Sequence, residues 1–138
     1  MNNTVLIVTG TFYKDIAKNM VFKAIETLAD NDFNHECINV PGAFEIPAVI
    51  SSLSKKDKYI GFVALGCVIR GETSHYDYIC SETARALMDL SLQGVAIGYG
   101  ILTCENKKQA EKRQFDKGES AAIACVKMIQ VIHEASNK

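Results

Sequence analysis

A short apolar run followed by helical spacing is the feature that most constrains this chain. Residues Tyr59 to Leu65 are mostly apolar and close on Gly66, which predicts a buried strand. From Tyr76 to Leu92, apolar side chains recur at helical spacing, which predicts a helix. The residues between them, Arg70 to His75, therefore form a strand-to-helix turn. A strand that passes directly into a helix favours a parallel α/β sheet.

The rest of the chain repeats this alternation. Strands are expected at residues 5–9, 37–40, 59–65 and 95–103, and helices at residues 15–29, 44–53, 76–92, 107–113 and 119–135. Pro47 is tolerated in the first turn of its helix, and Gln93-Gly94 is a helix C-cap signal. Right-handed crossovers then predict a three-layer, flavodoxin-like α/β sandwich. We expect a four-stranded parallel sheet of order 2-1-3-4 flanked by helices, in one domain spanning residues 1–138.

Composition and charge exclude several classes of protein. Hydrophobic residues make up 48% and charged residues 22% of the 138, which is typical of a globular chain. The net charge is −1 without a basic block, so we expect no nucleic-acid partner. No apolar run reaches the roughly 18–20 residues that span a bilayer, and the N-terminus lacks a basic signal-peptide region. Five cysteines without CxxC spacing indicate reduced thiols in the cytoplasm and disfavour a zinc site.

Unusual residues follow each of the four expected strands. They fall at residues 11–13, 41–45, 70–75 and 103–106. Because the strands are expected to be parallel, all four segments meet at the carboxyl edge of the sheet, where such folds bind ligands. The turn at residues 70–75 also ends on a helix N-terminus, which offers free N–H groups to an anion. The sequence therefore predicts an active site at this edge, with a place for a phosphate.

Polar side chains at this edge suit proton transfer and phosphate binding. His75 carries an imidazole, a group that suits proton transfer near neutral pH, although a histidine at a helix start can simply be satisfied by backbone or water. Arg113 and Lys117 could bind a phosphate or could be solvated surface charges. The segment Gly71–Ser74 could hold phosphate through N–H and hydroxyl groups, and Thr73 or Ser74 could equally cap the helix.

Two aromatic side chains also follow expected strands, Phe12 in the loop after the first and Phe44 just after Pro41-Gly42. Phe44 could stack on a flat heterocycle and Glu45 could bind sugar hydroxyls, or the pair could be a core aromatic and a first-turn acid. Phe12 could form a second stacking wall or could pack in the core. The chain has no P-loop, GxGxxG or HExxH pattern, and no serine or cysteine is marked as a nucleophile.

Long motifs resemble one enzyme family. Residues Val40–Pro47 and Ala64–Tyr78 are similar to the motifs of 6,7-dimethyl-8-ribityllumazine synthases. The similarity continues at Tyr99–Thr103, Gln109–Arg113 and Asp116–Gly118, so it covers nearly the whole chain.

The resemblance implies a transferase reaction in riboflavin biosynthesis. A 5-amino-6-ribitylamino-pyrimidinedione would condense with 3,4-dihydroxy-2-butanone 4-phosphate through a Schiff base, with release of phosphate and water. No metal or organic cofactor would be used.

The resemblance also implies a role for each matching residue. His75 would move protons and Arg113 would bind the phosphate. The expected pyrimidine- and ribityl-binding residues are Phe12, Ala43, Phe44, Glu45, Val68, Ile69, Arg70 and Tyr99. The expected phosphate-binding residues are Gly71, Glu72, Thr73, Ser74, Arg113 and Lys117.

The family is built on homopentamers whose sites are shared between neighbouring subunits. Phe12, Glu45 and His75 would come from one subunit, and Tyr99, Arg113 and Lys117 from the next. Some members form icosahedral shells, but the first strand here begins almost at Met1 without the usual N-terminal extension, so we expect a pentamer. Two features depart from the family pattern. Tyr13 replaces the usual asparagine after Phe12, and only three residues separate Arg113 from Lys117.

Three other interpretations remain. A non-catalytic lumazine- or flavin-binding relative would keep the pocket, but it would not need His75, Arg113 and Glu45 together. A riboflavin synthase on the same fold would not need the phosphate residues. A flavodoxin-like domain of another function would leave the motif agreement unexplained.

Overall fold

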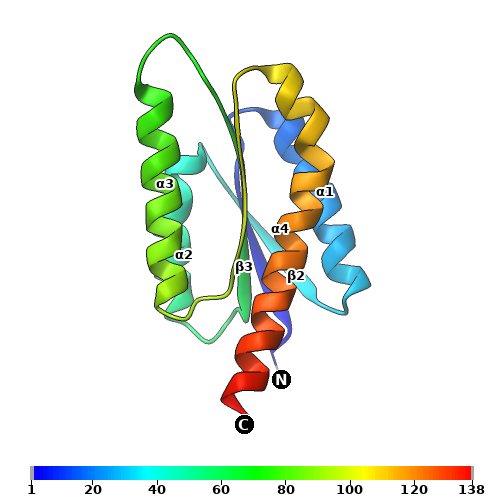
Figure 1. The fold of residues 1–138 in the computed structure, drawn as a ribbon. Coiled ribbons are helices and arrows are strands. Elements are labelled where there is room, and N and C mark those ends of the chain that lie inside the picture. The colour runs from blue at the N-terminus through cyan, green and yellow to red at the C-terminus, as the bar shows by residue number, and fades with distance from the viewer. Residues whose placement is uncertain (1, 138) are drawn as a thin grey trace.

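The computed structural model describes residues 2–137 as alternating strands and helices (Figure 1). The elements are, in order, β1 (Thr4–Gly10), α1 (Lys14–Asp30), β2 (Asn34–Val40), the 3₁₀ helix η1 (Ala43–Glu45), α2 (Ile46–Ser54), β3 (Gly61–Ile69), α3 (His75–Leu92), β4 (Ile97–Cys104) and α4 (Lys107–Ser136). Among these residues, the helices contain no stretch long and apolar enough to cross a membrane.

The four strands form one parallel sheet of order β2-β1-β3-β4, which confirms the predicted topology. Figure 1 shows α1 and α4 on one side of the sheet and α2 and α3 on the other. The central strand β3 is buried almost throughout, since helices cover both of its faces. Gly10 pairs with Val40 and Ile69 pairs with Cys104, so β1 and β2 end at one level and β3 and β4 at another. Because Thr9 pairs with Leu65, β3 continues past the end of β1.

Two apolar clusters fill the space between the layers. One packs α1 and α4 against the sheet through side chains such as Ile7, Met20 and Val126. The other packs α2 and α3 against the opposite face through side chains such as Leu6, Ile50 and Leu87. Alternate residues of each strand therefore point to opposite layers, and both layers are apolar.

Several predicted boundaries shift in the structure. The third strand was expected to end at Leu65, yet β3 continues to Ile69 because residues 66–69 keep pairing with β4. Gly66 does not break the strand, since it pairs with Ile101 of β4 within the ladder. The second strand also begins earlier than expected, at Asn34, and the predicted cap at Gln93-Gly94 is confirmed with a φ of +93° at Gly94.

The prediction of two closing helices is wrong. Residues 107–113 and 119–135 belong to one continuous helix, α4, and the expected break at residues 114–118 is helical. Contacts with α1 explain this difference. Gln114 accepts a hydrogen bond from Asn19 at 3.0 Å, and Gly118 lies so close to the backbone of Met20 that a Cβ there would stand 2.5 Å from its carbonyl oxygen.

Candidate active site

Three connections at the carboxyl edge of the sheet enclose a hollow of about 580 Å³, here called the aromatic hollow. They are the β1–α1 loop, the β2–η1 connection with η1 itself, and the β3–α3 turn. The lining includes the predicted residues Phe12, Ala43, Phe44, Glu45, Val68, Ile69, Gly71, Thr73 and His75. The structure therefore brings together predicted residues that lie more than sixty positions apart in the sequence.

Aromatic rings form much of this wall. Phe12 is 74% exposed and Phe44 is 55% exposed, which is unusual for such large apolar side chains. The ring of Tyr13 meets that of Phe12 edge to face, with centroids 4.9 Å apart and an interplanar angle of 75°. Such pairs are attractive beyond their buried area, so Tyr13 supports the orientation of Phe12. An exposed, supported ring can stack on a flat heterocycle.

Local hydrogen bonds shape the rest of the aromatic hollow. The Glu45 carboxylate accepts a hydrogen bond from the backbone N–H of Gly42 at 2.8 Å, so it closes the turn before η1. The backbone N–H of His75 donates to the hydroxyl of Thr73 at 3.3 Å. Thr73 thus satisfies a free N–H at the start of α3, whereas Ser74 makes no side-chain cap bond.

A second hollow, of about 460 Å³, lies between β4 and α4 and is here called the cationic hollow. Arg113 and Lys117 line it from α4, where their spacing of four residues places them on one helical face. Gln109 precedes Arg113 by the same spacing, and its backbone carbonyl accepts a hydrogen bond from Arg113 Nη1 at 3.4 Å. Because α4 is continuous, the three residues between Arg113 and Lys117 complete one helical turn, which produces this alignment.

Electrostatics give the cationic hollow its character. Burial raises the pKa of the Cys104 thiol, which lies in its wall, while Arg113 and Lys117 act in the opposite direction by favouring the thiolate. The positive charges of Arg113 and Lys117 therefore both reach the thiol of Cys104. Asp116 also lines the hollow and offsets part of the positive charge.

Tyr99 lies at the edge of the sheet beside the cationic hollow. Lys117 Nζ stands 5.5 Å from the centre of its ring, within range of a cation–π interaction. Burial raises the pKa of the Tyr99 phenol, so the group stays neutral near pH 7. This residue borders the site without forming part of either lining.

Arg70, Glu72 and Ser74 belong to the predicted turn but lie outside the linings of both hollows. Arg70 makes ion pairs with Glu105 at 3.0 Å and with Asp77 at 3.4 Å. Its guanidinium also lies 4.4 Å from the centre of the Tyr76 ring. The side chain of Arg70 is thus directed to protein groups, which the sequence pattern did not anticipate.

Other lining residues were given no binding role from the sequence. They are Tyr13, Pro41, Gly42, Cys67, Tyr76, Tyr78 and Ile79 in the aromatic hollow and Ile101, Leu102, Thr103, Cys104, Gln109, Asp116 and Ser120 in the cationic hollow. Helical spacing from Arg113 could have indicated Gln109, since the two are four residues apart. Within residues 2–137, no three His, Cys, Asp or Glu side chains gather in a way that could hold a metal ion.

Comparisons with known proteins agree with the sequence motifs. Residues 2–133 match the family model described as 6,7-dimethyl-8-ribityllumazine synthase. The chain is 46% identical over 137 residues to the 6,7-dimethyl-8-ribityllumazine synthase of Bartonella bacilliformis, covering 94% of this chain and 90% of that protein. It is 42% identical over 130 residues to the enzyme of the same name from Sphingopyxis alaskensis, covering 91% of this chain and 92% of that protein. The chain therefore belongs to the 6,7-dimethyl-8-ribityllumazine synthase family.

Proposed function

We propose that the aromatic and cationic hollows are complementary halves of an active site that carries out the reaction of this family. That reaction forms 6,7-dimethyl-8-ribityllumazine in riboflavin biosynthesis and is a transferase reaction. The substrates would be 5-amino-6-ribitylamino-pyrimidinedione and 3,4-dihydroxy-2-butanone 4-phosphate, and the whole chain, residues 1–138, would act as one domain. The five free cysteines support a cytoplasmic location.

The observation that carries the proposal is the division of the expected site into two hollows of different character. The aromatic hollow, with Phe12 and Phe44, suits the flat pyrimidine, and Glu45 at its rim suits the ribityl chain. The main chain of residues 68–70 would run along the pyrimidine edge. The cationic hollow, with Arg113 and Lys117, suits a phosphate dianion.

The expected chemistry assigns different tasks to the two halves. The pyrimidine amine attacks the ketone carbonyl to give a Schiff base with loss of water, phosphate then leaves, and ring closure releases a second water. His75 would move protons at these steps, and Arg113 with the 71–74 turn would hold the phosphate. Positioning two substrates together can be worth roughly 7–11 kcal/mol, whereas a general base typically adds about 10²–10⁴-fold.

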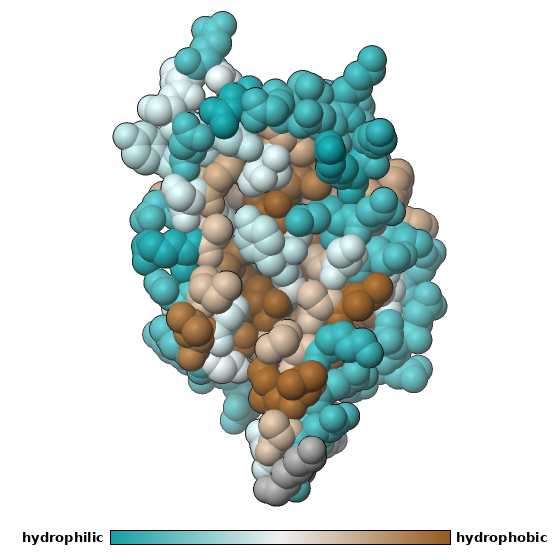
Figure 2. Space-filling view, in the orientation of Figure 1, coloured by the Kyte–Doolittle hydropathy of each residue, from teal (hydrophilic) through white to brown (hydrophobic). Residues whose placement is uncertain are grey.

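Separate hollows on one chain also support a site shared between subunits. A neighbour that presents its cationic hollow to the aromatic hollow would complete the site, as in the homopentamer expected from the sequence. Figure 2 shows apolar surface along the face that lies between α3 and α4. Large exposed side chains on these helices include Met88, Leu92, Met128 and Val131. Exposed apolar patches commonly mark surfaces that bind other protein subunits.

The first test is to mix the purified protein with the two substrates and to follow the absorbance of the lumazine product. We expect His75→Ala to slow product formation by about 10²–10⁴-fold without abolishing it, since positioning remains. Arg113→Ala should reduce activity more, because a dianionic phosphate loses its main counter-charge. Arg85→Ala, which changes an exposed arginine outside both hollows, is the matched control.

Two results would count against the proposal. Negligible effects of both His75→Ala and Arg113→Ala would refute the site assignment. An inactive protein that binds a lumazine or riboflavin tightly would instead favour the non-catalytic relative.

A further inference from the structure

The turn at residues 71–74 receives little support from apolar packing. Each residue from Arg70 to His75 is exposed, and a Cβ built on Gly71 would meet no described atom within 4 Å. Yet this turn carries the groups proposed to hold phosphate, and it leads directly into His75. Catalysis by positioning needs such groups to be held closely, so something other than the core has to order the turn.

Arg70 makes the contacts that connect this turn to the rest of the molecule. Its Nε donates to Glu105 Oε2 at 3.0 Å, which joins the end of β3 to the segment after β4. Its Nη2 lies 3.4 Å from Asp77 Oδ1, in the first turn of α3. The ring of Tyr76 covers the guanidinium at 4.4 Å. The turn is therefore held on both sides, before residue 71 and after residue 74.

The same contacts continue towards the cationic hollow. The backbone N–H of Glu105 donates to the side chain of Gln109 at 2.8 Å, and the carbonyl of Gln109 accepts from Arg113. The Arg70 backbone N–H donates to the carbonyl of Cys104 at 2.9 Å. Glu105 thus lies between the turn of the aromatic hollow and the helix that carries Arg113.

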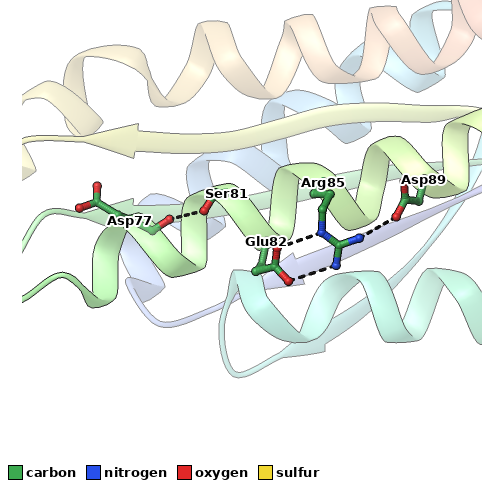
Figure 3. A network of polar contacts seen from close by, with 5 residues as sticks. All are labelled: Asp77, Ser81, Glu82, Arg85 and Asp89. Atoms are coloured by element: carbon green, nitrogen blue, oxygen red, sulfur yellow. Dashed lines mark hydrogen bonds and ion pairs between the residues drawn. The ribbon is translucent and has the colours of Figure 1, made fainter.

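Arg85 on α3 is a useful comparison, because its ion pairs do not connect separate elements of the fold. Arg85 pairs with Glu82 at 2.9 Å and with Asp89 at 2.8 Å, and Figure 3 shows all three side chains on the same helix. These pairs join residues three and four positions apart, so they link no separate elements. The Arg70–Glu105 pair spans 35 positions and joins the segment after β3 to the segment after β4.

We infer that Arg70 is a positioning residue, whose guanidinium, held by Glu105, Asp77 and the Tyr76 ring, orders the 71–75 turn for the proposed reaction. This inference rests on the proposed function of the turn. The side chain of Arg70 would then act through the turn and not by touching substrate. Glu105, for which the sequence indicated no role, would share this task.

Kinetics of Arg70→Met and Glu105→Ala test the inference. Both variants should raise KM for the butanone phosphate by about three- to tenfold, while KM for the pyrimidine changes less than about twofold. Arg70→Lys should restore only part of the loss, because an ammonium lacks the planar fork that reaches both carboxylates. Arg85→Met and Glu82→Ala are the matched controls and should leave both constants unchanged.

The double variant separates positioning from direct binding. If Arg70 acts through Glu105, the combined Arg70→Met and Glu105→Ala changes should cost no more than either single change. If Arg70 bound substrate itself, Glu105→Ala would leave KM unchanged or lower it, and this result would overturn the inference. Unchanged KM values in both single variants of an active enzyme would overturn it as well.

Amide hydrogen exchange tests the positioning role of Arg70 without measuring activity. Its outcome is therefore independent of whether the protein forms lumazine. Amide hydrogen exchange in residues 71–75 should accelerate in Glu105→Ala and remain as in the original protein in Glu82→Ala. The contacts of Arg70 are exposed, so the thermal unfolding midpoint should barely change. Equal exchange in both variants would refute the positioning role even if the protein formed no lumazine.

Discussion

At the scale of single residues, side chains expected to bind ligands also hold the protein's own backbone and loops. Glu45 accepts the N–H of Gly42, and Thr73 accepts that of His75. The ring of Phe12 packs at a steep angle against that of Tyr13. Tyr13 therefore supports the ring proposed to stack on the pyrimidine.

Buried thiols give a pH dependence that can be measured on the folded protein. Burial raises the pKa of Cys125 from its ordinary value of 9.0 to about 12. Above pH 9 the unfolded chain loses this proton while the folded chain keeps it, so the free energy of unfolding should fall between pH 9 and about 12. We expect Cys125→Ala to be less stable at pH 7 because of the cavity, but to lose less stability across this alkaline range.

Urea unfolding of both proteins at a series of pH values measures this difference. The two stability curves should converge above pH 9, where only the original chain carries the penalty. Curves that stay parallel up to pH 12 would show that the thiol of Cys125 titrates normally in the folded protein.

At the scale of secondary structure, the helix α4 is the element whose form matters most for the site. Its continuity sets Gln109, Arg113 and Lys117 on one face, and a break after Arg113 would have separated them. Continuity depends on close contact with α1, where Gly118 touches the backbone of Met20 and Gln114 meets Asn19. The packing of two helices thus determines the geometry of the proposed phosphate site.

Gly118→Ala tests this dependence. In an exposed helix interior, replacing glycine by alanine would stabilise the helix by about 1 kcal/mol. Here the new Cβ would stand 2.5 Å from the carbonyl oxygen of Met20, so α1 and α4 would have to separate. We expect a net loss of about 1–3 kcal/mol in the free energy of unfolding, as for other overpacked sites.

Denaturant unfolding measures the loss, with Gly71→Ala as the control for stability. A Cβ at Gly71 meets no described atom within 4 Å, so this change should leave the free energy of unfolding nearly unaltered. A Gly118→Ala protein as stable as the original would show that α1 and α4 separate easily.

At the scale of the whole molecule, the two hollows occupy different places on one subunit. The aromatic hollow opens at the carboxyl edge of the sheet, and the cationic hollow lies along β4 and α4. An assembly in which neighbours bring the two together would explain why each chain carries both halves. It would also cover the apolar surface seen in Figure 2.

Mixed assemblies test the sharing of sites. His75→Ala and Arg113→Ala subunits with different tags can be co-expressed and purified through both tags. In a random mixture, about one site in four would combine an intact aromatic half with an intact cationic half. Activity should therefore recover to about a quarter of the original value, well above the mean of the two pure variants.

The measured mass of the assembly should also fit a homopentamer with shared sites. Sedimentation should give a particle of five times the 15.2 kDa chain mass. Mixed particles whose activity equals the mean of the two pure variants would show that each subunit builds its own site.

Much of the fold could be predicted from the sequence, because strands and helices leave short-range patterns of apolar residues in the chain. Apolar runs and helical spacing predicted the four strands, their order and the helices α1 to α3, and glycine and proline positions indicated most connections. The placement of Phe12, Glu45 and His75 at one edge also followed, since parallel strands bring their carboxyl ends together.

The sequence alone determined the four strands, the helices α1 to α3 and the loops that meet at the carboxyl edge, because these depend on spacing along a few turns or strands. Only the tertiary structure decided that α4 runs unbroken, since this depends on α1 residues such as Asn19 and Met20 almost a hundred positions away. It likewise decided that Arg70 pairs with Glu105, because that contact exists only once β3 and β4 lie side by side. Contacts between distant segments leave no periodic trace in the chain, and here they set the geometry of the site.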